Sequence, residues 1–202
     1  MNGEAEQQRV LITAGSSGLG LATACAFQLA GAKVAICARG EEQLAQAKIT
    51  LDALTGQPVL AEVADLSQPA DIDKLIEHVE SHWGAIDVLV NNAGGPPPGE
   101  HTALEDEHWE KAFDLTLRSA VRVTNRVLPG MKKSGHGRII NLSSYSVKQP
   151  MPRMMLSNSL RLAGLGWAKT LSNELAADNI LVNTICTGWT KTQRVDQLLE
   201  AR

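Results

Sequence analysis

The segment that most constrains the fold is a glycine-rich turn directly after the first apolar run. An apolar run over residues 10–12 is followed by Thr-Ala-Gly-Ser-Ser-Gly-Leu-Gly over residues 13–20, and a helical pattern of apolar residues begins at Leu21. This order predicts a strand, a tight loop and the start of a helix. Glycines let the backbone approach a ligand closely, and the first N–H groups of a helix attract an anion. The segment is therefore typical of a phosphate-binding loop.

Apolar runs alternate with amphipathic patterns along the rest of the chain. Further strands are predicted at residues 33–38, 58–63, 86–90, 138–142 and 180–185. Helices are predicted at residues 41–55, at about 69–83, at about 107–133 with a break near Pro129, and at about 155–177. Because the strand runs are apolar on both faces, they indicate a parallel sheet with helices on both sides. We predict an α/β fold with a doubly wound parallel sheet, a single Rossmann domain over residues 1–202.

The composition restricts the class of protein and its partners. Hydrophobic residues make up 44% of the chain and aromatic residues 3%, so the core is built from Ala, Val, Ile and Leu. The net charge is -3 and no basic face stands out, which argues against nucleic acid as a partner. Residues 1–8 are polar, no apolar run is long enough to span a membrane, and the cysteines Cys25, Cys37 and Cys186 are scattered. We expect a cytoplasmic protein with no membrane partner.

Polar signatures follow the predicted strands where these end. Besides the glycine-rich turn, they comprise Arg39, Asp65, residues 91–94, Ser144 and the pair Thr187-Gly188. In a doubly wound sheet the ligand lies along the carboxyl ends of the strands. The sequence therefore predicts a dinucleotide site at this edge of the sheet.

These motifs make the chain resemble the short-chain dehydrogenase/reductase family, especially its 3-oxoacyl-carrier-protein reductase branch, over about residues 9–192. Residues 13–20 resemble the phosphate loop of the family, although Ala14 stands at the usual first glycine position and the glycine falls one later. Asp65-Leu66 resembles the adenine-contacting pair, and residues 91–94 are the family's Asn-Asn-Ala-Gly motif. Residues 183–192 resemble the motif N-x-x-x-P-G-x-x-x-T, with Thr187 where proline is usual.

The resemblance implies that these motifs hold a nicotinamide dinucleotide. The residues expected to bind it are Thr13, Gly15, Ser16, Ser17, Gly18, Leu19, Gly20, Arg39, Asp65, Leu66, Asn92, Ala93, Gly94, Arg161, Thr187 and Gly188.

The stretch after the second predicted strand bears on which dinucleotide is bound. An enzyme that uses NAD usually places a carboxylate there for the ribose 2′-hydroxyl, but residues 36–40 contain no acid. Arg39 can instead pair with a 2′-phosphate through charge-assisted hydrogen bonds. The alternative is that Arg39 is a solvated loop residue. We predict NADP(H) as the cofactor, with NAD(H) less favoured.

The resemblance also implies where the chemistry lies. In the family a tyrosine transfers the proton, and a lysine four residues later lowers its pKa and binds the ribose. A serine orients the substrate oxygen, and an asparagine supports a water relay. Alignment without gaps places Ser144 at the serine position, Ser157 at the tyrosine, Arg161 at the lysine and Thr116 at the asparagine. Ser144, Ser157 and Arg161 are therefore the predicted catalytic residues, and the last two share a helix face.

The substitutions change the proton chemistry that the family uses. A serine hydroxyl is a far weaker acid than a phenol, whose reference pKa is about 10. Arg161 can bind ribose hydroxyls or an oxyanion, but it stays protonated and cannot relay a proton. Tyr145, the one tyrosine of the chain, is an alternative proton donor, three residues before Lys148. If the strand continues past Ser144, however, the side chain of Tyr145 points away from that serine.

Two further groups of residues have the chemistry of ligands. His78 and His82 are four residues apart on a predicted helix, a spacing that can bind metal, but no third ligand is apparent and two surface histidines are favoured. No metal site is predicted. Met151, Met154 and Met155 either line an adaptable apolar substrate entrance or fill space under a loop.

Two expectations concern assembly and the end of the chain. Gly164 and Gly166 lie inside a predicted helix, which the family packs against its copy in a neighbouring subunit. The resemblance thus implies a homodimer or homotetramer, and close packing on the chain's own sheet is the alternative. The sequence stops at Arg202, so we expect the usual C-terminal lid and seventh strand to be lacking, with residues 193–202 as the start of the lid segment.

Together these features predict an NADP(H)-dependent oxidoreductase. It would interconvert a ketone and a secondary alcohol on a small-molecule substrate, as 3-oxoacyl-thioester reductases do. The alternative is a catalytically inactive nucleotide-binding sensor or partner subunit, which the substituted catalytic positions favour.

Overall fold

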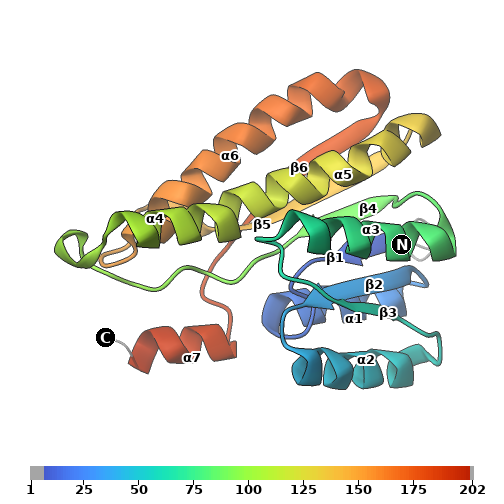
Figure 1. Ribbon diagram of the computed structural model, residues 1–202, viewed down its shortest axis with the longest axis horizontal. Helices are drawn as coiled ribbons and strands as arrows, with labels where there is room; N and C mark the ends of the chain where they lie inside the picture. Colours follow the sequence, from blue (N-terminus) through green and yellow to red (C-terminus); the bar gives the residue numbers. More distant parts are fainter. Residues whose placement is uncertain (1–6, 201–202) are drawn as a thin grey trace.

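Six parallel strands form one sheet in the computed structural model, which describes residues 7–200 (Figure 1). The strands run in the spatial order β3-β2-β1-β4-β5-β6. Because the order reverses between β1 and β4, a crevice opens there at the carboxyl ends of the strands. The strands are β1 (Arg9–Ile12), β2 (Lys33–Ala38), β3 (Leu60–Val63), β4 (Val88–Asn91), β5 (Gly137–Ser144) and β6 (Ile180–Thr187).

Helices cover both faces of this sheet, which confirms the predicted doubly wound α/β fold (Figure 1). Val10 and Ile12 pack in one core cluster with α1 and α2, whereas Leu11, between them, packs in the other with α3, α5 and α6. All three side chains are fully buried, and each contributes about 1.5–3 kcal/mol by leaving water. The helices are α1 (Gly18–Leu29), α2 (Glu41–Thr55), α3 (Pro69–Trp83), α4 (Asp106–Phe113), α5 (Ser119–Ser134), α6 (Met155–Leu175) and α7 (Gln193–Glu200).

Short helical turns complete the chain between these elements. Three are 3₁₀ turns and η2 is a π-helix between α4 and α5. Their bounds are η1 (His101–Ala103), η2 (Asp114–Arg118), η3 (Tyr145–Val147) and η4 (Ala176–Asp178).

The predicted helix break near Pro129 is wrong. Pro129 lies inside α5, which continues to Ser134. A proline removes one hydrogen bond from a helix, but Val127 and Met131 on either side of it are fully buried, so tertiary packing holds the helix together. The long helical tract changes geometry earlier instead, at the π-helix η2, which carries Thr116.

The edge strand β6 exposes apolar side chains. Leu181 is 45% exposed and Ile185 50% exposed, and β6 pairs on one side with β5. The three cysteines are unpaired, with Cys37 fully buried and Cys25 and Cys186 partly buried. Across the described part of the chain, none of the helices has the length and apolarity needed to traverse a lipid bilayer.

Candidate active site

The glycine-rich turn joins β1 to α1 and brings backbone atoms close together. A side chain at Gly20 would collide with the carbonyl oxygen of Ala14 and with the amide nitrogen of Asn92. A side chain at Gly15 would collide with Ile36 of β2. Ser17, the N-cap of α1, makes no side-chain hydrogen bond to the helix. The first N–H groups of α1 are therefore available to an anion, as the sequence predicts.

Ala14 occupies a backbone conformation that suits glycine. Its φ is 46°, in the left-handed region, where a Cβ costs about 1–2 kcal/mol. This agrees with the observation that Ala14 stands where the family has its first glycine.

We expect Ala14→Gly to raise the free energy of unfolding by up to about 1 kcal/mol, because relief of the strain exceeds the extra chain entropy of glycine. Urea denaturation measures this change. The matched variant is Ala22→Gly, at an exposed position in the middle of α1, and it should lower the free energy of unfolding by about 1 kcal/mol. Equal losses in both variants would show that Ala14 is not strained.

Hydrogen bonds fasten β1 to β4 where the strand order reverses. The hydroxyl of Thr13 donates to the carbonyl oxygen of Asn92 at 2.6 Å, and the backbone N–H of Asn92 donates back to that hydroxyl at 2.8 Å. The side-chain amide of Asn92 donates to the carbonyl oxygen of Ala14 at 3.1 Å. These bonds fix the phosphate loop against the Asn-Asn-Ala-Gly motif.

A cleft of about 340 Å³ opens above this junction. It brings together the three predicted catalytic residues and about half of the predicted cofactor-binding residues. Those that line it are Ser17, Gly18, Leu19, Asn92, Ala93, Gly94, Ser144, Ser157, Arg161, Thr187 and Gly188.

The other predicted cofactor-binding residues lie around this cleft. Gly15, Ser16 and Gly20 belong to the phosphate loop, and Thr13 and Leu66 line a smaller cavity. Arg39 is exposed at the end of β2 and forms no hydrogen bond or ion pair within the described residues 7–200. Asp65 follows β3, and its carboxylate accepts a hydrogen bond from the backbone N–H of Ser67 at 2.9 Å, which shapes the turn.

Arg161 lies at the centre of the site, on α6. Its Nε donates to the hydroxyl of Ser157 at 3.2 Å, and its Nη1 donates to the carbonyl oxygen of Leu142 at 3.3 Å. Burial lowers the pKa of the Arg161 guanidinium, and the positive charge of Arg194 lowers it further. Serine and arginine therefore share one helix face as predicted, and among residues 7–200 no aspartate or glutamate lines the cleft beside the guanidinium.

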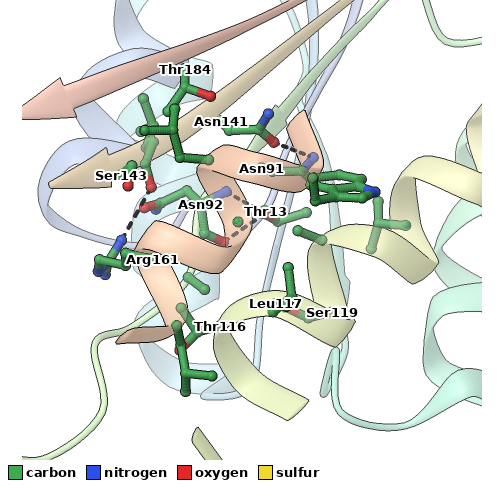
Figure 2. A pocket seen from close by; sticks show the side chains of 18 of the residues that line it. Thr13, Asn91, Asn92, Thr116, Leu117, Ser119, Asn141, Ser143, Arg161 and Thr184 are labelled. Carbon is green, nitrogen blue, oxygen red and sulfur yellow. Dashed lines mark hydrogen bonds between the residues drawn. The ribbon is translucent and has the colours of Figure 1, made fainter. Parts of the chain in front are cut away.

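A smaller cavity of about 50 Å³ lies behind Arg161, and Figure 2 shows its lining. The side-chain amide of Asn91 donates to Asn141 at 2.9 Å and to the hydroxyl of Thr124 at 3.0 Å. Four buried polar atoms along this lining have no hydrogen-bond partner in the described chain, namely Asn91 Oδ1, Thr116 Oγ1, Asn141 Nδ2 and Ser143 Oγ. A polar cavity of this size fits bound water, which would satisfy them.

The orientation predicted for Tyr145 required the strand to continue past Ser144, and it does not. The strand β5 ends at Ser144, and the chain turns into the 3₁₀ turn η3, so Tyr145 lines the same cleft as Ser144. Its hydroxyl accepts a hydrogen bond from the indole N–H of Trp189 at 2.9 Å. Lys148 is exposed and does not line the cleft. Tyr145 thus forms a wall of the site, whereas the pair Tyr145 and Lys148 is not assembled.

Met151 and Met154 line the cleft, whereas Met155 lies on a separate surface hollow. The imidazole of His78 stacks on that of His82 and lies 3.3 Å from a carboxylate oxygen of Glu62. Over residues 7–200, no group of three or more His, Cys, Asp or Glu side chains could hold a metal ion.

The comparisons with known proteins agree with this geometry. The protein family described as "short chain dehydrogenase" matches this chain over residues 8–202. The chain belongs to the short-chain dehydrogenase family. The predicted resemblance is thereby confirmed, and the fold is that of an oxidoreductase of this family.

Three solved structures of the family are similar to this chain. L-Sorbose reductase from Gluconobacter frateurii, complexed with NADPH and L-sorbose, has a TM-score of 0.94 at 34% identity and is matched over 100% of this chain and 76% of its own. A variant of actinorhodin polyketide ketoreductase with NADPH has a TM-score of 0.93 at 34% identity, over 96% of this chain and 75% of its own. An NADPH-bound short chain oxidoreductase from Pseudomonas aeruginosa PAO1 has a TM-score of 0.90 at 28% identity, over 97% of this chain and 78% of its own, and is described as containing an atypical catalytic center.

Two features of this short-chain dehydrogenase were missed from the sequence. Arg194 on α7 lines the cleft, and its Nη2 donates to the carbonyl oxygen of Pro96 at 2.6 Å. Trp189 lines it as well and contacts Tyr145. The sequence signal for Trp189 was its place within the motif over residues 183–192, and that for Arg194 was its place two residues after Thr192.

Proposed function

We propose that this short-chain dehydrogenase interconverts a ketone and a secondary alcohol with NADP(H), with 3-oxoacyl compounds as the first substrate class to test. One observation carries the proposal: Ser144, Ser157 and Arg161 line one cleft together with the N-terminus of α1 and the Asn92–Gly94 segment. The family relation and the NADPH named with all three similar structures support it.

The residues of the nucleotide site fit such a cofactor. Gly15 and Gly20 let the phosphate loop pack closely against Ile36 and Asn92, and the N-terminus of α1 has no side-chain cap, so its N–H groups are available to a pyrophosphate. Arg39 is free and exposed at the end of β2, where the ribose 2′-phosphate of the adenosine half would be held. Arg161 would hold ribose hydroxyls of the nicotinamide half. The bound cofactor would supply the hydride, which is chemistry that no side chain of this chain provides.

The remaining residues would handle the substrate oxygen. The hydroxyls of Ser144 and Ser157 donate hydrogen bonds to it. The guanidinium of Arg161 stabilises the negative charge that develops on it as the ketone is reduced, a role that requires no proton transfer from arginine. Because serine and arginine do not release a proton near neutral pH, we infer that the proton comes from the bulk solvent and reaches the substrate oxygen through water in the cavity beside Thr116 and Ser143.

The inactive nucleotide-binding protein stays a second candidate, and the absence of a tyrosine at Ser157 favours it. Fluorescence titration with NADPH and NADH, followed by assay of NADPH oxidation across thioesters, quinones and sugars, separates the two. Turnover of any ketone supports the enzyme. Tight NADPH binding with no turnover across the panel would establish the second candidate.

We expect Arg39→Gln to weaken NADPH binding by about tenfold or more, because two or more charge-assisted hydrogen bonds to the 2′-phosphate are lost. NADH binding should change by less than about twofold, since NADH lacks that phosphate. The two dissociation constants are measured by the same titration. The control Lys133→Gln removes an exposed charge from α5 and should change neither. Equal weakening of both nucleotides in Arg39→Gln would contradict the assignment.

We also propose that the protein forms a homodimer or homotetramer through α6. A side chain added at Gly166 would meet no atom within 4 Å, and one at Gly164 would meet only Leu117, at 3.9 Å. Packing on the chain's own sheet therefore does not require these glycines. Leu162, on the same helix, is 53% exposed. Because α7 reaches the cleft through Arg194, we propose that it begins the substrate-covering segment.

A further inference from the structure

The cleft carries positive charge without compensation. The side chains that line it include two guanidinium groups, Arg161 and Arg194, and the described chain contributes no aspartate or glutamate to this lining. The two charges are close enough for Arg194 to lower the pKa of Arg161. Two like charges in one partly buried site repel each other, and an anion between them would relieve that repulsion.

Neither guanidinium has a carboxylate partner within residues 7–200. Arg161 donates to a hydroxyl and a carbonyl oxygen, and Arg194 donates to the carbonyl oxygen of Pro96, so most of their ten N–H donors stay unused. Other arginines of the described chain do have carboxylate partners. These pairs are Arg9 with Asp87, Arg118 with Asp114, and Arg126 with Asp73.

The guanidinium of Arg194 contacts the segment after β4 and not the phosphate loop. Thr192 lies against Gly18 of that loop, but Arg194, two residues later, reaches the segment after β4. A side chain at Gly95 would lie 3.2 Å from Nη2 and 3.3 Å from Nε of Arg194, so the guanidinium rests against a backbone without a side chain. The N-terminus of α1 and Arg39 already provide for the phosphates of the nucleotide.

We propose that the substrate carries a carboxylate, that is, that it is an oxo acid or the corresponding hydroxy acid, and that Arg194 binds this carboxylate. This rests on the proposed function, which places the ketone oxygen at Ser144 and Ser157. A guanidinium matches a carboxylate with two parallel hydrogen bonds, and Met151, Met154 and Trp189 offer apolar surface to the carbon chain. The guanidinium of Arg161 attracts the same carboxylate with a second positive charge while it still contacts the substrate oxygen.

The test measures binding, so it does not depend on turnover. Calorimetry with the full chain, both alone and saturated with NADP⁺, compares 2-oxobutanoate, 3-oxobutanoate and 4-oxopentanoate with their methyl esters. The N-acetylcysteamine thioester of 3-oxobutanoate serves as a neutral thioester. We expect at least one acid to bind about tenfold or more tightly than its ester, and Arg194→Met to reduce that ratio to near one.

Matched variants test whether the guanidinium of Arg194 binds the carboxylate of the substrate or instead the nucleotide. Lys191→Met removes an exposed charge three residues away that does not line the cleft, and it should keep the preference for the acid. Gly95→Val, which displaces the guanidinium of Arg194, should reduce it. NADP⁺ binding should change by less than about twofold in Arg194→Met.

Three results would overturn the proposal. They are equal binding of acids and esters, no binding of any acid with or without NADP⁺, and loss of NADP⁺ affinity in Arg194→Met, which would assign the charge to the nucleotide. Acid preference that depends on Arg194 in a protein without turnover would leave this inference standing and refute the proposed reductase activity instead.

Discussion

Gly20→Ala is expected to weaken NADPH binding by at least about tenfold and to lower the free energy of unfolding by about 1–3 kcal/mol. The new Cβ would collide with the carbonyl oxygen of Ala14 and the amide of Asn92, and neither atom can move freely. Ala14 belongs to the phosphate loop, and Asn92 is fastened to Thr13 at 2.8 Å. The loop must therefore shift away from β4, which moves the N–H groups of α1 out of register with the pyrophosphate.

Fluorescence titration and urea denaturation measure the two effects. Gly40→Ala is the matched control, because a side chain there meets nothing within 4 Å and its φ of −87° suits alanine. This variant should bind NADPH like the unmodified chain. If Gly20→Ala bound NADPH with unchanged affinity, the phosphate loop would not be the nucleotide site.

Arg161→Met should lower kcat/KM by about 100-fold or more, equivalent to about 3 kcal/mol of transition-state stabilisation. Methionine fills similar space but removes the charge facing the substrate oxygen and the hydrogen bond to Ser157, 3.2 Å long. Arg161→Lys keeps the charge and should retain part of the activity. Steady-state kinetics with the best ketone of the panel measure these losses.

Tyr145→Phe tests whether the tyrosine, rather than water in the cavity, delivers the proton. The hydroxyl of Tyr145 is held by Trp189, so we expect a smaller loss than in Arg161→Met. Loss of activity in Tyr145→Phe alone, with Arg161→Met active, would transfer the catalytic role to the tyrosine.

The sequence predicted the sheet and the strand, turn and helix around the glycine-rich segment well, for physical reasons. Strands buried on both faces can only be apolar, and the crowding around Gly15 and Gly20 admits no other residue. The resemblance to the family placed the serine and the arginine four residues apart on one helix face, and the structure joins Arg161 to Ser157 there.

The errors came from features that spacing does not encode. Strand alternation would point Tyr145 away from Ser144 only if β5 continued, but β5 ends at Ser144 and the chain enters the turn η3. The low helix propensity of proline led us to predict a break at Pro129, but the buried residues on either side keep the helix intact. Arg194 contacts Pro96, 98 residues away in sequence, and only the fold brings the two together.

Deuterium transfer tests the central claim most directly. The full chain is mixed with a ketone or oxo acid and with NADPH that carries deuterium at both C4 positions of the nicotinamide, so that transfer from either face delivers deuterium. The alcohol product is analysed by mass spectrometry. The proposed function predicts one deuterium on the carbinol carbon, at a rate at least about 100-fold lower in Arg161→Met. A protein that binds NADPH tightly but transfers no deuterium to any substrate would contradict the account.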